Sequence, residues 1–220
     1  MVDMKSSHLA MAFALCLSAC GGDGPGTGVN AYPSAQAPLL NITAKTRAPK
    51  QWMVFCSHYA RACRTEAPAV IPLTPQTWSL LVSINNQVNQ KLDYVDDSDT
   101  TGRVDSWDLL AIDNAVVTGD CEDAALTKKE LLIARGMPAG AMRLALVQRP
   151  YHKGRGVQLD HAVLVVETSN GSFMLDSLDY RVKSVGDTDY RFLKVSAPTL
   201  TDPHGWAWVH GAQQTKASPH

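Results

Sequence analysis

The chain has little net charge, no long hydrophobic run and no internal repeat. Its 20 Lys and Arg residues nearly balance its 21 Asp and Glu residues, so the formal net charge is -1. This balance provides no basic field that would attract nucleic acid and no acidic tail. The apolar run Leu9–Leu17 is too short to remain in a membrane as a spanning helix. What is present is ordinary globular composition over 220 residues, enough for one domain with a full-sized core.

The amino-terminal segment has the pattern of an export signal. The short apolar run follows Lys5 and ends in Leu17-Ser18-Ala19-Cys20, which resembles the bacterial lipobox. We therefore expect a lipoprotein-type signal peptide over residues 1–19 and lipidation of Cys20. The alternative is an ordinary cleaved signal beside an incidental cysteine. Either reading predicts a periplasmic protein, and the first also predicts a lipid anchor in a bacterial membrane.

The five cysteines then have different expected fates. Cys16 would leave with the signal, and Cys20 would carry the lipid. Cys56 and Cys63 are close enough in sequence to close a small disulfide loop in an oxidising compartment, although two reduced cysteines are an alternative. Cys121 is left over, and an unpaired thiol in an exported protein suggests a reactive group.

Composition and periodicity divide the rest of the chain. Residues 20–50 are rich in Gly, Pro, Ala and Ser and predict a flexible tether, residues 51–212 a folded domain, and residues 213–220 a disordered tail. Apolar spacing predicts a core-facing helix from Thr77 to about Leu92. Helices followed by consecutive strands predict an α+β fold, with helices packed on an antiparallel sheet. The predicted strands are "AMRLALVQ", "HAVLVVE", "SFMLDS" and "YRFLKV".

Three residues at the ends of these elements could form a nucleophilic site. Asp120 can cap a helix that begins at Cys121, and the positive end of a helix favours a thiolate. His161 opens one strand and Asp176 closes the next. Together they would supply a nucleophile, a base and an orienting carboxylate. Singly, each has a structural alternative: a core cysteine, a hydrogen-bonded histidine and a turn-forming aspartate.

The turn between these two strands decides whether His161 and Asp176 can meet. With a tight turn at Asn170-Gly171, Asp176 would lie about 13 Å from His161 along the strand. A four-residue loop over Thr168–Gly171 instead pairs Asp176 with Val163, diagonal to the histidine and on the same face. We therefore expect the longer loop.

The motifs in combination resemble those of a known family. "GDCEDAALTKKELLIARGMP", "DHAVLVVETSNGSFMLDSL" and "YRFLKV" are similar to segments of the bacterial transglutaminase-like cysteine proteinases, in particular the LapG-like periplasmic cysteine proteases. The similarity extends over about residues 51–209. It implies a papain/transglutaminase-like core and a catalytic triad of Cys121, His161 and Asp176.

The carboxylates around Cys121 call for a cation. Three acidic side chains raise the pKa of a neighbouring thiol unless a positive charge neutralises them. In the LapG-like branch, the residues at the positions of Asp120 and Glu122 bind Ca²⁺, so the resemblance implies a calcium site here. Asp105, Asp123 or the Asp97–Asp99 loop could complete the shell. Alternatively, Asp120 only caps the helix and its acidic neighbours only favour the helix terminus.

The preferred function is an exported thiol-dependent hydrolase, a cysteine protease that cleaves a peptide bond of a cell-envelope or surface protein. One alternative is transglutaminase-type acyl transfer to an amine. The other is a non-catalytic, lipid-anchored binding module, which a fully buried Cys121 would favour. The resemblance also implies an inner-membrane regulatory receptor as a partner.

Overall fold

The fold is described from a computed structural model. The described residues are 30–63, 66–95, 106–113, 115–150, 160–197, 202 and 204–210. The predicted signal peptide over residues 1–19, the lipidation at Cys20 and the tail over residues 213–220 lie outside these residues.

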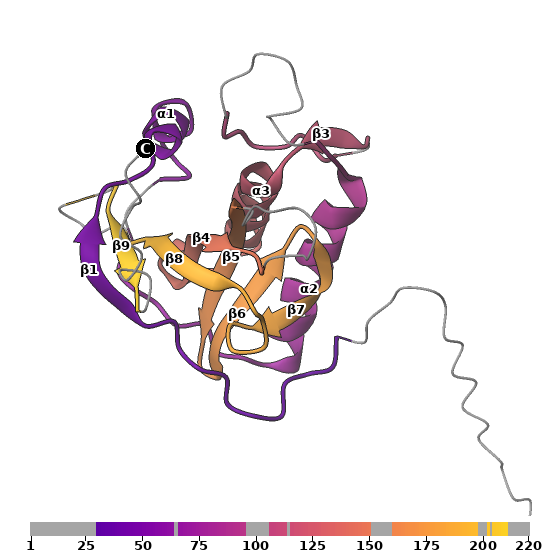
Figure 1. Ribbon diagram of the computed structural model, residues 1–220. Helices are drawn as coiled ribbons and strands as arrows, with labels where there is room; N and C mark the ends of the chain where they lie inside the picture. The colour runs from indigo at the N-terminus through magenta and orange to yellow at the C-terminus, as the bar shows by residue number, and fades with distance from the viewer. Residues whose placement is uncertain are drawn as a thin grey trace, which may run out of the picture.

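An antiparallel sheet forms the centre of the domain (Figure 1). Within the described residues it has seven strands in the order β1-β9-β8-β4-β5-β6-β7. The four strands predicted from sequence are confirmed as β4, β5, β6 and β8. The strand bounds are β1 Ile42–Thr46, β4 Met142–Gln148, β5 Asp160–Thr168, β6 Gly171–Asp176, β7 Asp179–Ser184, β8 Arg191–Ser196 and β9 Trp206–Val209, with β2 Leu92–Tyr94 and β3 Val117–Gly119 in a separate parallel pair.

The helices are α1 Lys50–His58, α2 Pro75–Lys91 and α3 Cys121–Ala134, with a short 3-10 turn, η1, over Ala139–Ala141. The hydroxyl of Thr74 caps α2 by accepting the N–H of Thr77. The predicted cap on α3 is confirmed, because the Asp120 carboxylate accepts the N–H of Asp123 at 3.5 Å. No helix in the described part of the chain is long and apolar enough to cross a membrane.

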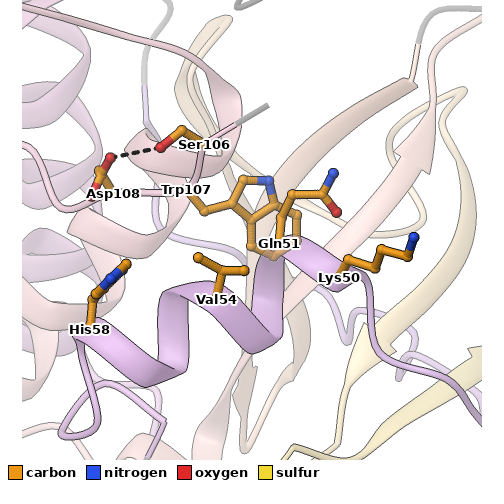
Figure 2. Close-up of a pocket in the computed structure, with 7 residues that line it drawn as sticks. All are labelled: Lys50, Gln51, Val54, His58, Ser106, Trp107 and Asp108. Carbon is orange, nitrogen blue, oxygen red and sulfur yellow. Dashed lines mark hydrogen bonds between the residues drawn. The ribbon is translucent and has the colours of Figure 1, made fainter. Parts of the chain in front are cut away.

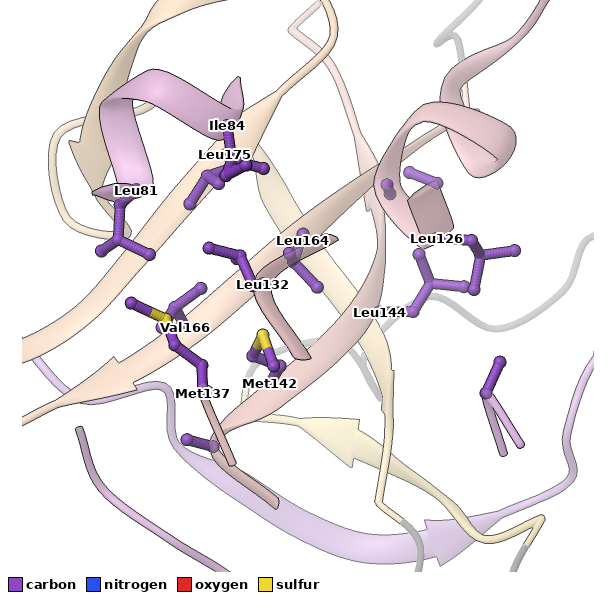
Figure 3. Packing of buried hydrophobic residues seen from close by; sticks show 14 of the residues in the cluster. Leu81, Ile84, Leu126, Leu132, Met137, Met142, Leu144, Leu164, Val166 and Leu175 are labelled. Carbon is purple, nitrogen blue, oxygen red and sulfur yellow. The ribbon is translucent and has the colours of Figure 1, made fainter. Parts of the chain in front are cut away.

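The central strands of the sheet are buried on both faces. Helices α2 and α3 pack against one face, where Leu81, Leu132 and Leu164 share a core cluster (Figure 3). Val163 and Val165 belong to a second cluster, so successive residues of β5 are buried on opposite sides. This explains why the strand is apolar at nearly every position instead of alternating. The predicted α+β architecture, with helices on an antiparallel sheet, is confirmed.

The predicted tether over residues 20–50 is wrong at its carboxyl end. Ile42–Thr46 forms β1, which pairs with β9 at the edge of the sheet. Ala37 is also buried, and its N–H donates to the carbonyl of Asn170. The sequence of this segment shows no alternation of apolar and polar residues. An edge strand that exposes most of its side chains does not require such alternation.

The β5–β6 hairpin has the register that brings His161 and Asp176 together. Leu164 pairs with Leu175, and the same register places Asp176 opposite Val163, as predicted. The predicted four-residue loop is shorter in the structure, because Thr168 and Gly171 still pair. Gly171 has a φ of 105° and approaches the Ala37 backbone closely, so a side chain would not fit there.

The predicted disulfide between Cys56 and Cys63 is present. It joins the end of α1 to the segment that follows, whose Ala62 carbonyl accepts a hydrogen bond from Lys129 of α3. The disulfide therefore helps to hold α1 close to α3. Among the described cysteines, Cys121 alone is free.

Candidate active site

Cys121 is the first residue of α3, and its side chain is only 6% exposed. Its Sγ donates to Oε2 of Glu122 at 2.9 Å. Burial raises the pKa of the Cys121 thiol well above its ordinary value, and the Glu122 carboxylate raises it further. A hydrogen bond from the Ala162 N–H lowers it only in part. Without a neighbouring cation or base, this cysteine is therefore a neutral thiol.

His161 and Asp176 form a buried pair on neighbouring strands. Nε2 of His161 lies 2.7 Å from Oδ1 of Asp176, and neither side chain is more than 1% exposed. The Leu178 N–H also donates to Oδ1, at 2.9 Å. Burial alone would raise the pKa of Asp176, but the hydrogen bond and charge of His161 lower it below its ordinary value. The carboxylate is thus a charged acceptor.

The other ring nitrogen of His161 is uncommitted. Nδ1 is buried and has no hydrogen-bond partner among the described residues. Ala162, whose N–H bonds to the Cys121 thiol, is the next residue along the strand. The structure therefore joins His161 directly to Asp176 and brings Cys121 to the backbone beside His161, while the thiol hydrogen points toward Glu122.

Tyr190 is part of this group, although the sequence pattern predicts only that it begins a strand. Its hydroxyl donates to Oδ2 of Asp176 at 2.8 Å. Its ring meets the His161 ring edge-on, with centroids 5.9 Å apart and an interplanar angle of 85°. It lies 14 residues from Asp176 in sequence, and no motif spacing marks it. Only the sheet order, which no local pattern encodes, brings it to the pair.

Tyr190→Phe is expected to destabilise the protein in a pH-dependent way. Removing the hydroxyl leaves Oδ2 of Asp176 without its donor and raises the pKa of Asp176 toward its ordinary value. Because a lowered carboxyl pKa contributes stability above the unfolded pKa of about 4, the loss of about 1–2 kcal/mol is full above about pH 5 and shrinks with acidification. Urea unfolding at pH 7 and at pH 3 measures this. Tyr180→Phe, at an exposed tyrosine, is the control, and an equal loss at both pH values would contradict the assignment.

Carboxylates surround the first turn of α3. Asp120 and Asp123 are buried, and Oδ1 of Asp123 accepts the Asp108 N–H at 2.7 Å. Burial raises the pKa of Asp123 to about 7, and the Asp120 and Asp108 charges contribute. Within the described residues, no three acidic, His or Cys side chains converge as a preformed metal site. Asp120 and Glu122 nevertheless have the hard oxygen atoms that Ca²⁺ prefers. The predicted contributions of Asp105 and the Asp97–Asp99 loop lie outside the described residues.

A pocket of about 470 Å³ lies between α1 and residues 106–108. Figure 2 shows α1 on one side, with Val54 and His58, and the segment of Trp107 and Asp108 on the other. Asp108 connects the pocket to the site through its hydrogen bond to Asp123, two residues after Cys121. The pocket is thus connected through Asp108 to the first turn of α3, which begins at Cys121.

Comparison with known proteins gives a family and a set of solved structures. No curated protein matches the chain. Calcium-bound LapG of Legionella pneumophila is 21% identical, with 68% of this chain and 77% of that chain covered and a TM-score of 0.47. A second Legionella pneumophila LapG structure is 26% identical over 56% and 65% of the two chains, with a TM-score of 0.42. The EGTA-treated form is 22% identical over 66% and 72%, with a TM-score of 0.45.

The family model described as bacterial transglutaminase-like cysteine proteinase, BTLCP, matches residues 42–214. This range contains β1, which the sequence had assigned to the tether, and every residue of the candidate site. The match confirms the predicted relationship and the predicted enzyme class. The chain belongs to the bacterial transglutaminase-like cysteine proteinases.

Proposed function

We propose that the protein hydrolyses peptide bonds through Cys121, His161 and Asp176. The observation that carries the proposal is the buried hydrogen bond from His161 to Asp176, which occupies Nε2 and leaves Nδ1 uncommitted beside the strand residue that contacts the thiol. A structural histidine would ordinarily satisfy both buried nitrogens. An unpaired nitrogen close to a cysteine at the first position of a helix is the arrangement expected of a general base and its nucleophile.

The residues would then act in sequence. Nδ1 of His161 accepts the Cys121 proton, and the thiolate attacks the peptide carbonyl carbon. Backbone N–H groups in the first turn of α3 stabilise the oxyanion, since a helix terminus offers unpaired donors. His161 returns its proton to the leaving amine, which breaks the C–N bond, and water releases the acyl group from sulfur. Asp176 holds the ring and stabilises its charged form throughout.

Asp120 and Glu122 are proposed to hold Ca²⁺. Their oxygen donors suit that ion, and calcium-bound LapG is among the similar structures. A bound cation would offset the negative charge that raises the thiol pKa. Glu122 would then accept less strongly from Sγ, so the Cys121 proton could pass to His161.

We also propose the setting of the reaction. The lipobox-like segment at Cys20 supports a lipid-anchored periplasmic protein, and the protease family supports a protein substrate of the cell envelope or surface. An inner-membrane receptor is proposed as the regulator, on the LapG-like resemblance alone.

Labelling with an iodoacetamide probe tests the nucleophile. In native protein with calcium, Cys121 should label faster than free glutathione, and Cys121→Ser should abolish the label. Slower labelling than glutathione would instead favour a binding module, which the burial of Cys121 at 6% exposure makes the relevant alternative. Incubation with a cell-envelope extract separates the chemistries: new peptide termini indicate hydrolysis, whereas ammonia release and cross-links indicate acyl transfer.

Calcium is expected to stabilise the protein and accelerate labelling of Cys121. At about a hundredfold excess over the dissociation constant, the free energy of unfolding should rise by about 2.7 kcal/mol. Asp120→Asn and Glu122→Gln should lose both responses, whereas Asp113→Asn, at an exposed position, should keep them. The measurements are thermal unfolding and alkylation rate during calcium and chelator titrations, with Mg²⁺ as the ion control. An unchanged unfolding curve and rate would remove the metal from the proposal.

A further inference from the structure

Lys128 lies in the middle of α3 with its side chain wholly buried, 0% exposed. It follows Cys121 by 128 − 121 = 7 residues, so the two side chains lie on the same side of the helix, two turns apart. Its Nζ has no hydrogen-bond partner among the described residues. A lone ammonium is costly to bury, so its position points to a compensating negative charge.

The adjacent Lys129 shows a different way to bury a lysine. Its Nζ donates to the carbonyl of Ala62 at 3.0 Å and lies 6.0 Å from the centre of the Trp52 ring. Among the described residues, Lys128 has neither kind of contact. Burial lowers the pKa of Lys128 to about 7, and attraction to the Asp176 carboxylate opposes that lowering. The Asp176 charge thus favours the charged form of Lys128, whereas burial favours its neutral form.

A positive charge would stabilise the buried carboxylate of Asp176. It ends β6, which packs against α3, and its carboxylate receives hydrogen bonds from His161, Leu178 and Tyr190. Helix α2 holds its backbone, since Asn89 Nδ2 donates to the Asp176 carbonyl at 2.8 Å. Within the described residues, no Lys or Arg forms an ion pair with this carboxylate. These donors position the carboxylate, but none of them carries a full positive charge while the His161 ring is neutral.

We propose that Lys128 is a positioning residue for the active site. In its protonated form, Lys128 balances the buried Asp176 carboxylate and keeps it ionised as the acceptor for the Nε2–H of His161. The Nδ1 atom of His161 is thereby held as the nitrogen that exchanges a proton with Cys121. This inference rests on the proposed function, because it assigns Lys128 a role in the same reaction.

Lys128→Met and the matched control Lys129→Met test the inference in the full chain. Lys128→Met should be at least as stable as wild type, because an apolar side chain of similar volume replaces a desolvated charge. It should nevertheless alkylate about tenfold more slowly at pH 7, and the downfield proton resonance of the His161–Asp176 hydrogen bond should move upfield. Lys129→Met should lose stability with the Ala62 contact but keep both the rate and the resonance.

Two outcomes overturn the role of Lys128: a wild-type rate and resonance in Lys128→Met, or equal slowing in Lys129→Met. If Lys128→Met does not fold, the coupling is measured from the other side. NMR titration of Lys128 should show that Asp176→Asn lowers the pKa of Lys128, and an unchanged value overturns the inference. Failure of the proposed function is separate, since it would show as wild-type alkylation in His161→Ala.

Discussion

His161→Ala is expected to slow alkylation of Cys121 by about 10²- to 10³-fold at pH 7, the range of a lost general base. Burial and the Glu122 carboxylate both raise the pKa of the thiol, so little thiolate forms without a nearby proton acceptor. In the proposed reaction, the unpaired Nδ1 of His161 takes that proton. The second-order rate constant with iodoacetamide measures the effect, with thermal unfolding as a check on folding.

Two further variants sharpen this test. His58→Ala removes an exposed histidine of α1 and should leave the rate unchanged. Asp176→Asn should slow the rate only about tenfold, because the amide oxygen still accepts from Nε2–H while the charge that stabilises the imidazolium is lost. Wild-type reactivity in His161→Ala would show that the histidine has only a structural role. A larger loss in Asp176→Asn than in His161→Ala would show that the carboxylate acts mainly on something other than the ring.

The elements that carry the site could be predicted because their signals are local. The Asp120 cap, the start of α3 at Cys121 and the strands that contain His161 and Asp176 each follow from caps, periodicity and turn residues within a few positions. Hairpin geometry also gave the register, although Thr168 and Gly171 extend the ladder farther than expected. In contrast, β1 and β9 are short strands that lie at opposite ends of the domain in sequence but pair in the sheet. Their pairing depends on the overall topology and not on a local pattern.

The same distinction holds within the site. Tyr190 and Lys128 reach Asp176 through the sheet order and the packing of α3, and each has an ordinary sequence context. Lys128 is adjacent to a second lysine in "LTKKELL", and the helical pattern of this segment does not predict that either lysine is buried. The burial of both lysines could not be predicted from the sequence, because charged residues are rarely buried unless the tertiary structure supplies their partners.

An aromatic cluster connects the amino-terminal part of the domain to the site. Trp52 of α1 packs on Phe55, Trp107 and Trp206, with ring centroids 5.9, 6.4 and 5.6 Å apart. Trp107 precedes Asp108, whose N–H holds the Asp123 carboxylate in the first turn of α3. The cluster therefore fixes the segment that positions the acidic side chains near Cys121.

Trp52→Ala is expected to lower the free energy of unfolding by about 3–5 kcal/mol, the usual cost of emptying a large aromatic site in a core. Trp52 is only 1% exposed and contacts three other rings, so the surrounding side chains cannot easily fill the space. Met53→Ala is the matched control, because the neighbouring side chain is 45% exposed and should cost under about 1 kcal/mol. Urea unfolding measures both variants. Because Trp107 would lose its support, folded Trp52→Ala should also respond more weakly to calcium, and an intact response would show that Asp108 holds Asp123 without help from the cluster.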